Sequence, residues 1–156
     1  MSACLAPLCS GRDTGRAMAE ESTTPDLVAL TCAMDAAADV EATMSFFGPD
    51  PVWDGSPLGL EIYEGRGAIR KSLEDWIEIY EDLEEDDHEI LDVGNGVVFT
   101  ATRLSGHRRS AGGDIRVHGL YGFVHVWTHG KVSRVTVYPD IDQARAVAER
   151  LAKERG

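Results

Sequence analysis

Three long stretches of the chain repeat apolar residues at every third or fourth position, which is the spacing of one helix face. The clearest is GAIRKSLEDWIEIYEDL, residues 67–83, where an apolar stripe lies opposite a charged side. Residues 23–40 and 141–155 follow the same rule, with Thr24 placed to cap the first of these helices and Asp140 the other. A shorter helix is predicted between the first two stretches, ending before the helix-breaking GPDP segment.

The second half of the chain changes to strand patterns separated by turn residues. Asn95-Gly96 and His129-Gly130 each predict a two-residue hairpin turn, since glycine supplies the positive φ that such turns need. The apolar phase shifts within residues 132–135, which predicts a β-bulge and therefore a curved sheet. The predicted strands cover residues 52–57, 60–63, 88–94, 95–106, 114–127 and 130–139.

Helices come first along the chain and hairpin-connected strands follow, an order that predicts an α+β fold rather than a parallel α/β fold. We expect a curved antiparallel sheet wrapped around the long helix, a cone-shaped α+β barrel whose open end offers a ligand pocket. The acidic run EDLEEDDHEI, residues 81–90, lacks the ligand spacing and central glycine of a calcium loop. We interpret it as a solvated helix end leading into an edge strand.

The length of 156 residues points to a single domain, and the apolar share of 43% is close to that of globular proteins. Residues 1–22 are small and polar without periodicity, so we expect a disordered tail there and a folded domain over residues 23–156. Met18 offers a second start for the chain.

The formal net charge of -12 argues against nucleic acid and anionic membranes as partners, because both require clusters of Lys and Arg. No apolar run reaches the roughly 20 residues of a membrane helix. Cys4, Cys9 and Cys32 lack metal-ligand spacing. Cys32 falls in a helical pattern and is interpreted as a small buried apolar residue in a reducing cytoplasm. No metal constellation and no glycine-rich phosphate loop is visible, so we predict no cofactor and no bound metal.

Three segments together resemble a known group of proteins: DVEATMSFFGPDPVWDG, YEGRGAIRKSLEDW and FVHVWTHGKVSRVTVYPDIDQA. Their order is similar to that of the nuclear transport factor 2-like superfamily, and within it the SnoaL-like group, over residues 26–151. That superfamily includes ketosteroid isomerase, limonene epoxide hydrolase, polyketide cyclases, dehydratases and non-catalytic modules. The resemblance therefore implies the fold and leaves the activity open.

The resemblance implies a catalytic role for Asp54, which stands in VWDGSP where ketosteroid isomerase-like members carry their general base. A carboxylate at the mouth of an apolar cone has a raised pKa, which suits proton removal beside a carbonyl. The alternative is a turn-forming Asp bonded to its own backbone. The oxyanion residues of that isomerase do not carry over, because Thr31 and Gly122 stand at those positions.

His118 is the second catalytic candidate, since a histidine on an apolar, curved strand face can act as acid or base near neutral pH. Regular alternation places it on the same face as Leu120, Gly122 and Val124. The segment beginning at Arg116 also resembles the Arg-x-Asp of limonene epoxide hydrolase, with His in place of the Asp. The alternative is a structural histidine with its hydrogen bonds satisfied.

The opposite face of the same strand carries Tyr121, Phe123, His125 and Trp127, which we interpret as a homodimer interface, because an exposed aromatic row is costly. One bulge would exchange the two rows, so the assignment of faces stays open. The residues expected to line the pocket are Trp53, Tyr63, Trp76, Arg116 and Tyr121.

Two functions are compatible with these residues. The first is an enzyme without a cofactor that isomerises, cyclises, dehydrates or hydrolyses a small apolar metabolite, with Asp54 as base and His118 as acid or base. The alternative is a non-catalytic ligand-binding or dimerisation module, which the missing oxyanion residues favour. A cone filled by Trp and Phe would favour the second function, and an open cone with converging polar groups the first.

Overall fold

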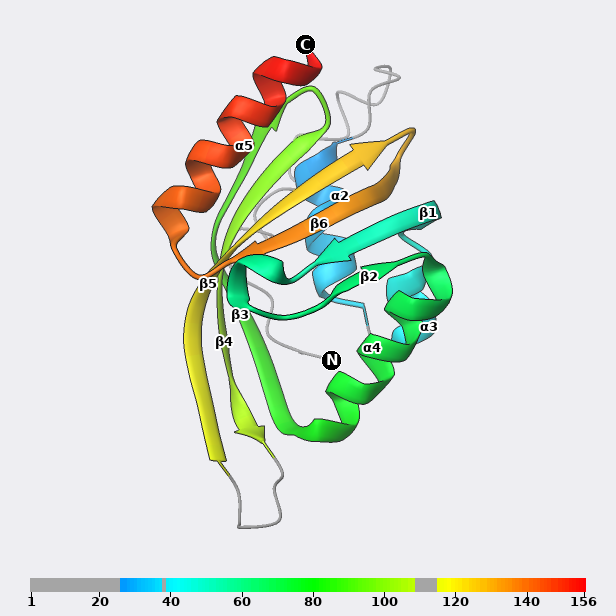
Figure 1. Ribbon diagram of the computed structural model, residues 1–156, viewed down its shortest axis with the longest axis vertical. Helices are drawn as coiled ribbons and strands as arrows, with labels where there is room; N and C mark the ends of the chain where they lie inside the picture. The colour runs from blue at the N-terminus through cyan, green and yellow to red at the C-terminus, as the bar shows by residue number, and fades with distance from the viewer. Residues whose placement is uncertain (1–25, 38, 109–114) are drawn as a thin grey trace.

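The structure, a computed structural model, describes residues 26–37, 39–108 and 115–156 (Figure 1). Four helices, one short 3-10 helix and six strands make up this part of the chain. In chain order they are α2 (Leu27–Asp35), α3 (Val40–Met44), β1 (Phe47–Asp54), η2 (Ser56–Leu58), β2 (Ile62–Glu64), α4 (Arg66–Ile79), β3 (Tyr80–Gly94), β4 (Val97–Arg108), β5 (Ile115–Thr128), β6 (Lys131–Tyr138) and α5 (Ile141–Arg155).

All six strands form one curved, open sheet in the order β2-β1-β6-β5-β4-β3. Neighbouring strands run antiparallel except β1 and β6, which pair in parallel. The α+β prediction is confirmed, and the prediction of a purely antiparallel sheet is corrected at this one pair. The parallel pair arises because β1 comes from the first half of the chain and joins the sheet without a hairpin.

Helices cover both faces of the sheet (Figure 1). We call the face packed against α2, α3 and α4 the inner face; its core includes Met44, Ile69 and Trp127. We call the face packed against α5 the outer face; its core includes Phe99 and Val124, with small residues of α5 against them. Because both faces are buried along much of β4 and β5, both rows of side chains there need apolar residues.

The helix caps explain where two of the helices begin. Asp26, rather than the expected Thr24, caps α2, and its Oδ1 accepts a hydrogen bond from Ala29 N at 3.1 Å. Thr24 itself lies outside the described residues. Asp140 caps α5 as predicted, accepting from Asp142 N at 2.9 Å and Gln143 N at 3.3 Å.

The predicted turns and bulge are confirmed. Asn95 and Gly96 have φ of 55° and 84°, and His129 and Gly130 have 54° and 77°, as two-residue hairpin turns require. In β6, Val132 pairs with Trp127 while Arg134 pairs with Val126, so Ser133 is the extra residue of a bulge.

The acidic run is the main correction to the predicted elements. The long helix ends at Ile79, not at residue 83, and β3 begins at once with Tyr80. The run is therefore part of an edge strand from its first residue. Alternate carboxylates in a strand point to opposite faces, so part of this run is turned into the protein rather than toward water.

Cys32 is 7% exposed, as expected of a small apolar side chain. It is also disulfide-bonded, which the sequence interpretation did not anticipate. No described helix is both long and apolar enough to span a bilayer.

Candidate functional site

Asp54 lies on the outer face of the sheet. The residue before it, Trp53, packs into the inner core, so alternation turns Asp54 to the other side of the sheet. Its Oδ1 accepts from Ser56 N at 2.9 Å, and its Oδ2 accepts from Arg134 Nη2 at 2.6 Å. Burial acts to raise its pKa, but the hydrogen bonds from Ser56 and Arg134 outweigh burial and lower it. The expectation of a raised pKa is wrong, and the turn-forming alternative describes these contacts.

His118 shares a face with Leu120, Gly122 and Val124, as expected, but that face is the outer one, because Val124 packs against α5. The His118 side chain is exposed, and its Nε2 lies 3.2 Å from Arg103 Nη1. Asp54 pairs with Thr136 of β6, and Thr136 in turn pairs with Val124 of β5. Since His118 is six residues from Val124, the strand rise separates it from that row by roughly 20 Å. The expected convergence of Asp54 and His118 in one cone is therefore wrong.

The aromatic row of β5 is part of the protein's own core. Trp127 and His125 are each 3% exposed, and Phe123 packs against the inner core. The interpretation of this row as a dimer interface is therefore wrong for these residues. The physical reason is α5: it covers the outer row, so both rows are partly apolar and alternation alone does not tell which one faces inward.

The predicted pocket-lining residues are dispersed. Trp53 lies in the inner core with its ring 6.5 Å from that of Phe47 and 6.4 Å from that of Phe123, and Tyr63 packs against the same core. Trp76 instead packs against Tyr80, with tilted rings whose centroids are 4.4 Å apart. The remaining two are Tyr121, partly buried with its ring against Gly119, and Arg116, which pairs with His107 in the sheet and whose side chain lies outside the described residues.

A group of carboxyls on the inner face is the strongest candidate site. Asp87 of β3 is 7% exposed and accepts a hydrogen bond from Thr102 Oγ1 of β4 at 2.7 Å. Thr102, 2% exposed, is also 3.4 Å from the hydroxyl of Thr100. Asp35, the last residue of α2, shares a hydrogen bond with Asp87. Two carboxyls from distant parts of the chain therefore meet beside a buried hydroxyl.

Two carboxyls of this group, Asp35 and Glu85, favour their protonated forms. Burial raises the pKa of Asp35 well above its ordinary value, and the charge of Asp87 raises it further. Burial also raises the pKa of Glu85 to about 7, with the charge of Asp87 as the second cause. Such a group holds a proton near neutral pH that an isolated carboxyl would have lost, which is the condition for a general acid.

His125 borders this group from β5. Burial lowers its pKa to about 4, although the charge of Asp87 acts in the opposite direction. The ring is therefore neutral at physiological pH, and its Nδ1 has no hydrogen-bond partner among the residues that the structure describes. Within the same described part of the chain, the buried Trp127 Nε1 and Thr31 Oγ1 lack hydrogen-bond partners as well. Buried polar atoms without partners are uncommon and indicate places where water or a ligand group would be stabilised.

This arrangement can move protons but offers no visible metal site. Within the described ranges, no group of three or more His, Cys, Asp and Glu is arranged to hold a metal ion. Proton transfer between a carboxyl pair and a neutral imidazole needs no such ion. We call Asp35, Glu85, Asp87, Thr102 and His125 the inner carboxyl cluster.

The family of this chain follows from its match to a family model. The family model for the SnoaL-like domain matches residues 29–135, more than half of the chain. The chain belongs to the SnoaL-like domain family. No functionally curated protein matches its sequence.

Solved structures share the fold of this SnoaL-like domain at low sequence identity. One is a hypothetical protein with a ketosteroid isomerase-like fold from Catenulispora acidiphila, in complex with trimethylamine (15% identity, 81% of this chain and 94% of that chain, TM-score 0.61). A protein described as a candidate polyketide cyclase from Pseudomonas putida is also similar (17%, 76% and 95%, TM-score 0.61). A third is SalBIII, described as an epoxide hydrolase/cyclase-like enzyme in pyran ring formation (18%, 70% and 83%, TM-score 0.57).

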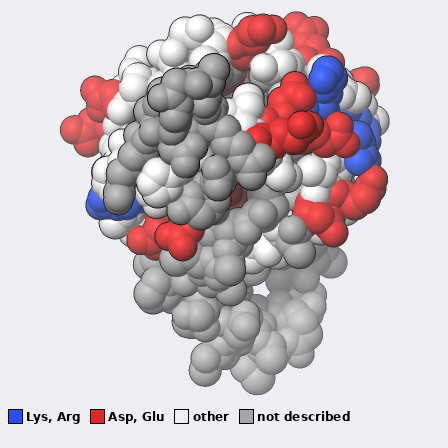
Figure 2. All heavy atoms as spheres, turned by 90° about the horizontal axis from the view of Figure 1, so that it is seen from below, with Lys and Arg blue, Asp and Glu red and all other residues white. Residues whose placement is uncertain are grey.

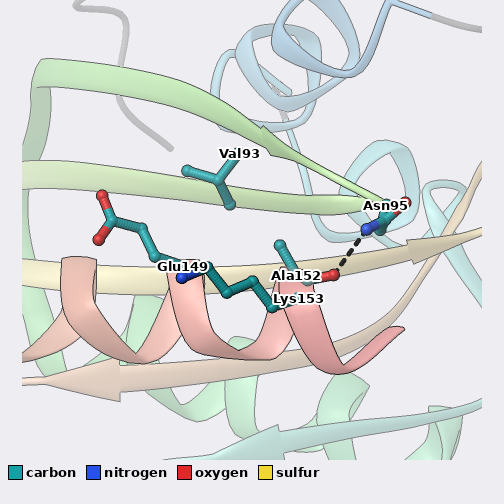
Figure 3. Close-up of a pocket in the computed structure, with 5 residues that line it drawn as sticks. All are labelled: Val93, Asn95, Glu149, Ala152 and Lys153. Carbon is teal, nitrogen blue, oxygen red and sulfur yellow. Dashed lines mark hydrogen bonds between the residues drawn. The ribbon is translucent and has the colours of Figure 1, made fainter. Parts of the chain in front are cut away.

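A separate hollow of about 400 Å³ lies on the outer side of the SnoaL-like domain, between the end of α5 and the β3–β4 turn (Figure 3). Asn95 Nδ2 donates to Ala152 O across it at 2.6 Å, which ties the turn to the helix. None of the predicted site residues lines this hollow; its lining residues are Val93, Asn95, Glu149, Ala152 and Lys153.

Charge elsewhere on the SnoaL-like domain is mainly acidic. Figure 2 shows acidic side chains over much of the described surface in that view, with basic ones at a few places. Asp35 and Glu85 of the inner carboxyl cluster differ from these surface groups because burial raises their pKa.

Proposed function

We propose that this SnoaL-like domain is a cofactor-independent acid–base enzyme that acts on a small apolar metabolite at the inner carboxyl cluster. The supporting observation is the contact between Asp35 and Asp87, in which burial and the neighbouring charge raise the pKa of Asp35. Two carboxyls that share a proton supply one acidic and one basic group at the same place.

The chemistry follows from the two protonation states of the pair. The ionised member removes a proton beside a carbonyl, and the protonated member delivers one to the oxygen or carbon that becomes negative. The Thr102 hydroxyl holds Asp87 in place, since it donates to Oδ1 at 2.7 Å. Isomerisation, cyclisation and dehydration all need such a proton exchange. The descriptions of two structural neighbours, a candidate polyketide cyclase and an epoxide hydrolase/cyclase-like enzyme, support this reaction class.

The second candidate function is a non-catalytic ligand-binding module. The observation that favours it is the aromatic packing of the inner core, where Phe47, Trp53 and Phe123 lie ring against ring. An interior filled in this way leaves less space for a substrate. A homodimer also stays a prediction, with a surface other than the buried β5 row.

Deuterium exchange tests the enzyme directly, without knowledge of the natural substrate. A panel of small enolisable ketones is incubated with the protein in D2O, and NMR follows loss of the protons beside each carbonyl. We expect catalysed exchange with at least one compound, and a decrease of roughly 10²-fold or more in Asp87→Asn. Asp35→Asn is expected to lower the exchange rate similarly, because it removes the second carboxyl that shares the proton.

Asp86→Asn is the matched control. Asp86 neighbours Asp87 in β3 and pairs with Arg103 in the sheet, so it points to the opposite face. It should retain exchange, as should Asp54→Asn. Loss of exchange in Asp54→Asn with full exchange in Asp87→Asn would contradict the proposal. Compounds that quench tryptophan fluorescence but never exchange would support the ligand-binding module instead.

A further inference from the structure

The strands β3, β4 and β5 continue beyond α5 (Figure 1). An arginine of β4 lies between two histidines of the neighbouring strands on the outer face. Arg103 of β4 donates from Nε to His88 Nε2 of β3 at 3.1 Å. Its Nη1 lies 3.2 Å from His118 Nε2 of β5. One guanidinium therefore links imidazoles from both neighbouring strands, and both histidines are exposed.

Strand geometry explains how the three side chains meet. Arg103 follows Thr102, which faces inward, so alternation turns Arg103 outward. His88 is the extra residue of a bulge, because Asp87 pairs with Thr102 and Glu89 with Ala101. The bulge brings His88 to the outer face beside Arg103.

Among the described residues, the guanidinium lacks the carboxylate partner that three other arginines have. Arg134 pairs with Asp54, Arg145 with Glu89, and Arg70 with Glu41, each within 2.9 Å. Within the part of the chain that the structure describes, Arg103 contacts imidazole nitrogens instead of a carboxylate. A guanidinium only donates hydrogen bonds, so each facing Nε2 must accept, and both rings are neutral in this arrangement.

Neutral imidazoles are weak substitutes for an anion beside a guanidinium, since charge-assisted pairs with carboxylate or phosphate are stronger. An arriving oxyanion would take the Arg103 donors. Asp86, with Oδ2 at 3.9 Å from His88 Nε2, is the acidic group beside this arrangement. Leu120, which pairs with Arg103 and is 41% exposed, adds an apolar contact next to it.

We propose that Arg103, His88 and His118 form an anion-binding site on the outer face that takes the oxyanion of a carboxylate or phosphate. The site is independent of the inner carboxyl cluster, because adjacent strand positions turn the two groups to opposite faces.

NMR of the histidine ring protons of the full chain tests the site. Sodium phosphate, and in a second series sodium benzoate, is added in the millimolar range at about pH 6, where imidazoles titrate, with ionic strength held constant by sodium chloride. We expect the signals of His88 and His118 to shift and saturate. His129, in the exposed β5–β6 turn, serves as the internal control and should stay unchanged. Saturation by benzoate alone identifies a carboxylate site, and saturation by phosphate alone a phosphate site.

Arg103→Gln should weaken the saturable shift at least tenfold, while Arg70→Gln, which removes an arginine paired with Glu41, should leave it unchanged. Circular dichroism checks that Arg103→Gln is folded, and His118→Gln provides a second variant that keeps the guanidinium and should weaken binding several-fold. Parallel shifts in all three histidines, shifts without saturation, or an unchanged response in folded Arg103→Gln would overturn the proposal.

Discussion

Thr102 and Arg103 are neighbours in β4, yet they belong to two opposite chemical environments. Thr102 points inward and donates to the buried Asp87, beside carboxyls whose pKa is raised by burial. Arg103 points outward and contacts two exposed histidines. One step along the strand separates a group that includes two carboxyls of raised pKa from a cation that contacts imidazoles.

A comparison of two aspartates shows that the partner, more than exposure, decides what a buried carboxyl does in this sheet. Asp54 and Asp87 are both buried aspartates, with 8% and 7% exposure. Asp54 has Arg134 as a partner and its pKa is lowered. Asp87 has an acidic partner, Asp35, whose pKa is raised. The neighbouring side chain therefore separates the two carboxyls: Asp54 is paired with an arginine, and Asp87, beside another acid, is the candidate catalytic group.

The largest effect is expected from a substitution that separates α5 from the outer face. A Cβ at Gly122 would overlap the Cβ of Ala144. Gly122→Val should therefore displace the helix and lower the free energy of unfolding by about 3 kcal/mol, at the upper end of overpacking costs. Urea unfolding followed by circular dichroism measures this change.

Gly119→Ala is the inner-face control on the same strand. Its new Cβ would meet the Tyr121 ring at 2.8–2.9 Å, but a ring end held by a flexible side chain can move away. We expect a cost below about 1 kcal/mol. The same loss of unfolding free energy in both variants would contradict the expected difference between a glycine covered by a helix and one covered by a side chain.

The second prediction concerns the pH dependence of stability, in which two inner-face groups act in opposite directions. The pKa of Glu85 is raised from 4.5 to about 7 on folding, so its contribution makes stability fall as pH rises through that window. The pKa of His125 is lowered from 6.5 to about 4, so its contribution makes stability rise with pH between those values. Asp35, with a raised pKa, adds to the fall.

Glu85→Gln should stabilise the protein by about 2 kcal/mol at pH 8, because it removes a carboxyl that is ionised there at a cost. In that variant, stability should rise more steeply between about pH 4 and 6.5 than in the parent. His125→Phe should show the reverse, a steeper fall toward pH 7. Urea unfolding at each pH measures these changes. If stability changed with pH equally in the parent and both variants, neither group would have a shifted pKa.

The smallest effect is expected at the outer-face pair of Asp54 and Arg134. Asp54→Asn keeps an acceptor for Ser56 N but loses the charged pair, at a cost of about 1 kcal/mol near neutral pH. Since folding lowers the Asp54 pKa, this stability is present above about pH 4 and is lost as pH falls further. The difference between parent and variant should therefore shrink toward pH 3, and a constant difference would contradict the assignment.

Much of the fold was predictable because local signals and tertiary structure agree. The Asn95-Gly96 turn, the Asp140 cap and the bulge in β6 are all present where the sequence places them. Residues 80–83 were misassigned because the helical apolar spacing continues into them. The parallel β1–β6 pair was missed because pairing between distant segments leaves no local pattern.

The candidate site was harder to predict. Glu85 and Asp87 stand in a run of acids that is typical of a solvated surface, and only the strand period reveals that they share a side. Thr100 and Thr102 are two residues apart in β4, and this spacing was the sequence signal for a row of polar side chains on the inner face. Asp35 was not predictable, since its contact with Asp87 depends on how α2 packs on β3.

The bulge at His88 has a consequence for how this protein can change by inheritance. Deletion of that single codon would remove the extra residue and leave every other side chain of β3 on its present side of the sheet. The same deletion at Leu91 would turn one end of the strand inside out. His88 is thus a position where a lineage can gain or lose an outward-facing imidazole in one in-frame step, while Asp87 stays buried.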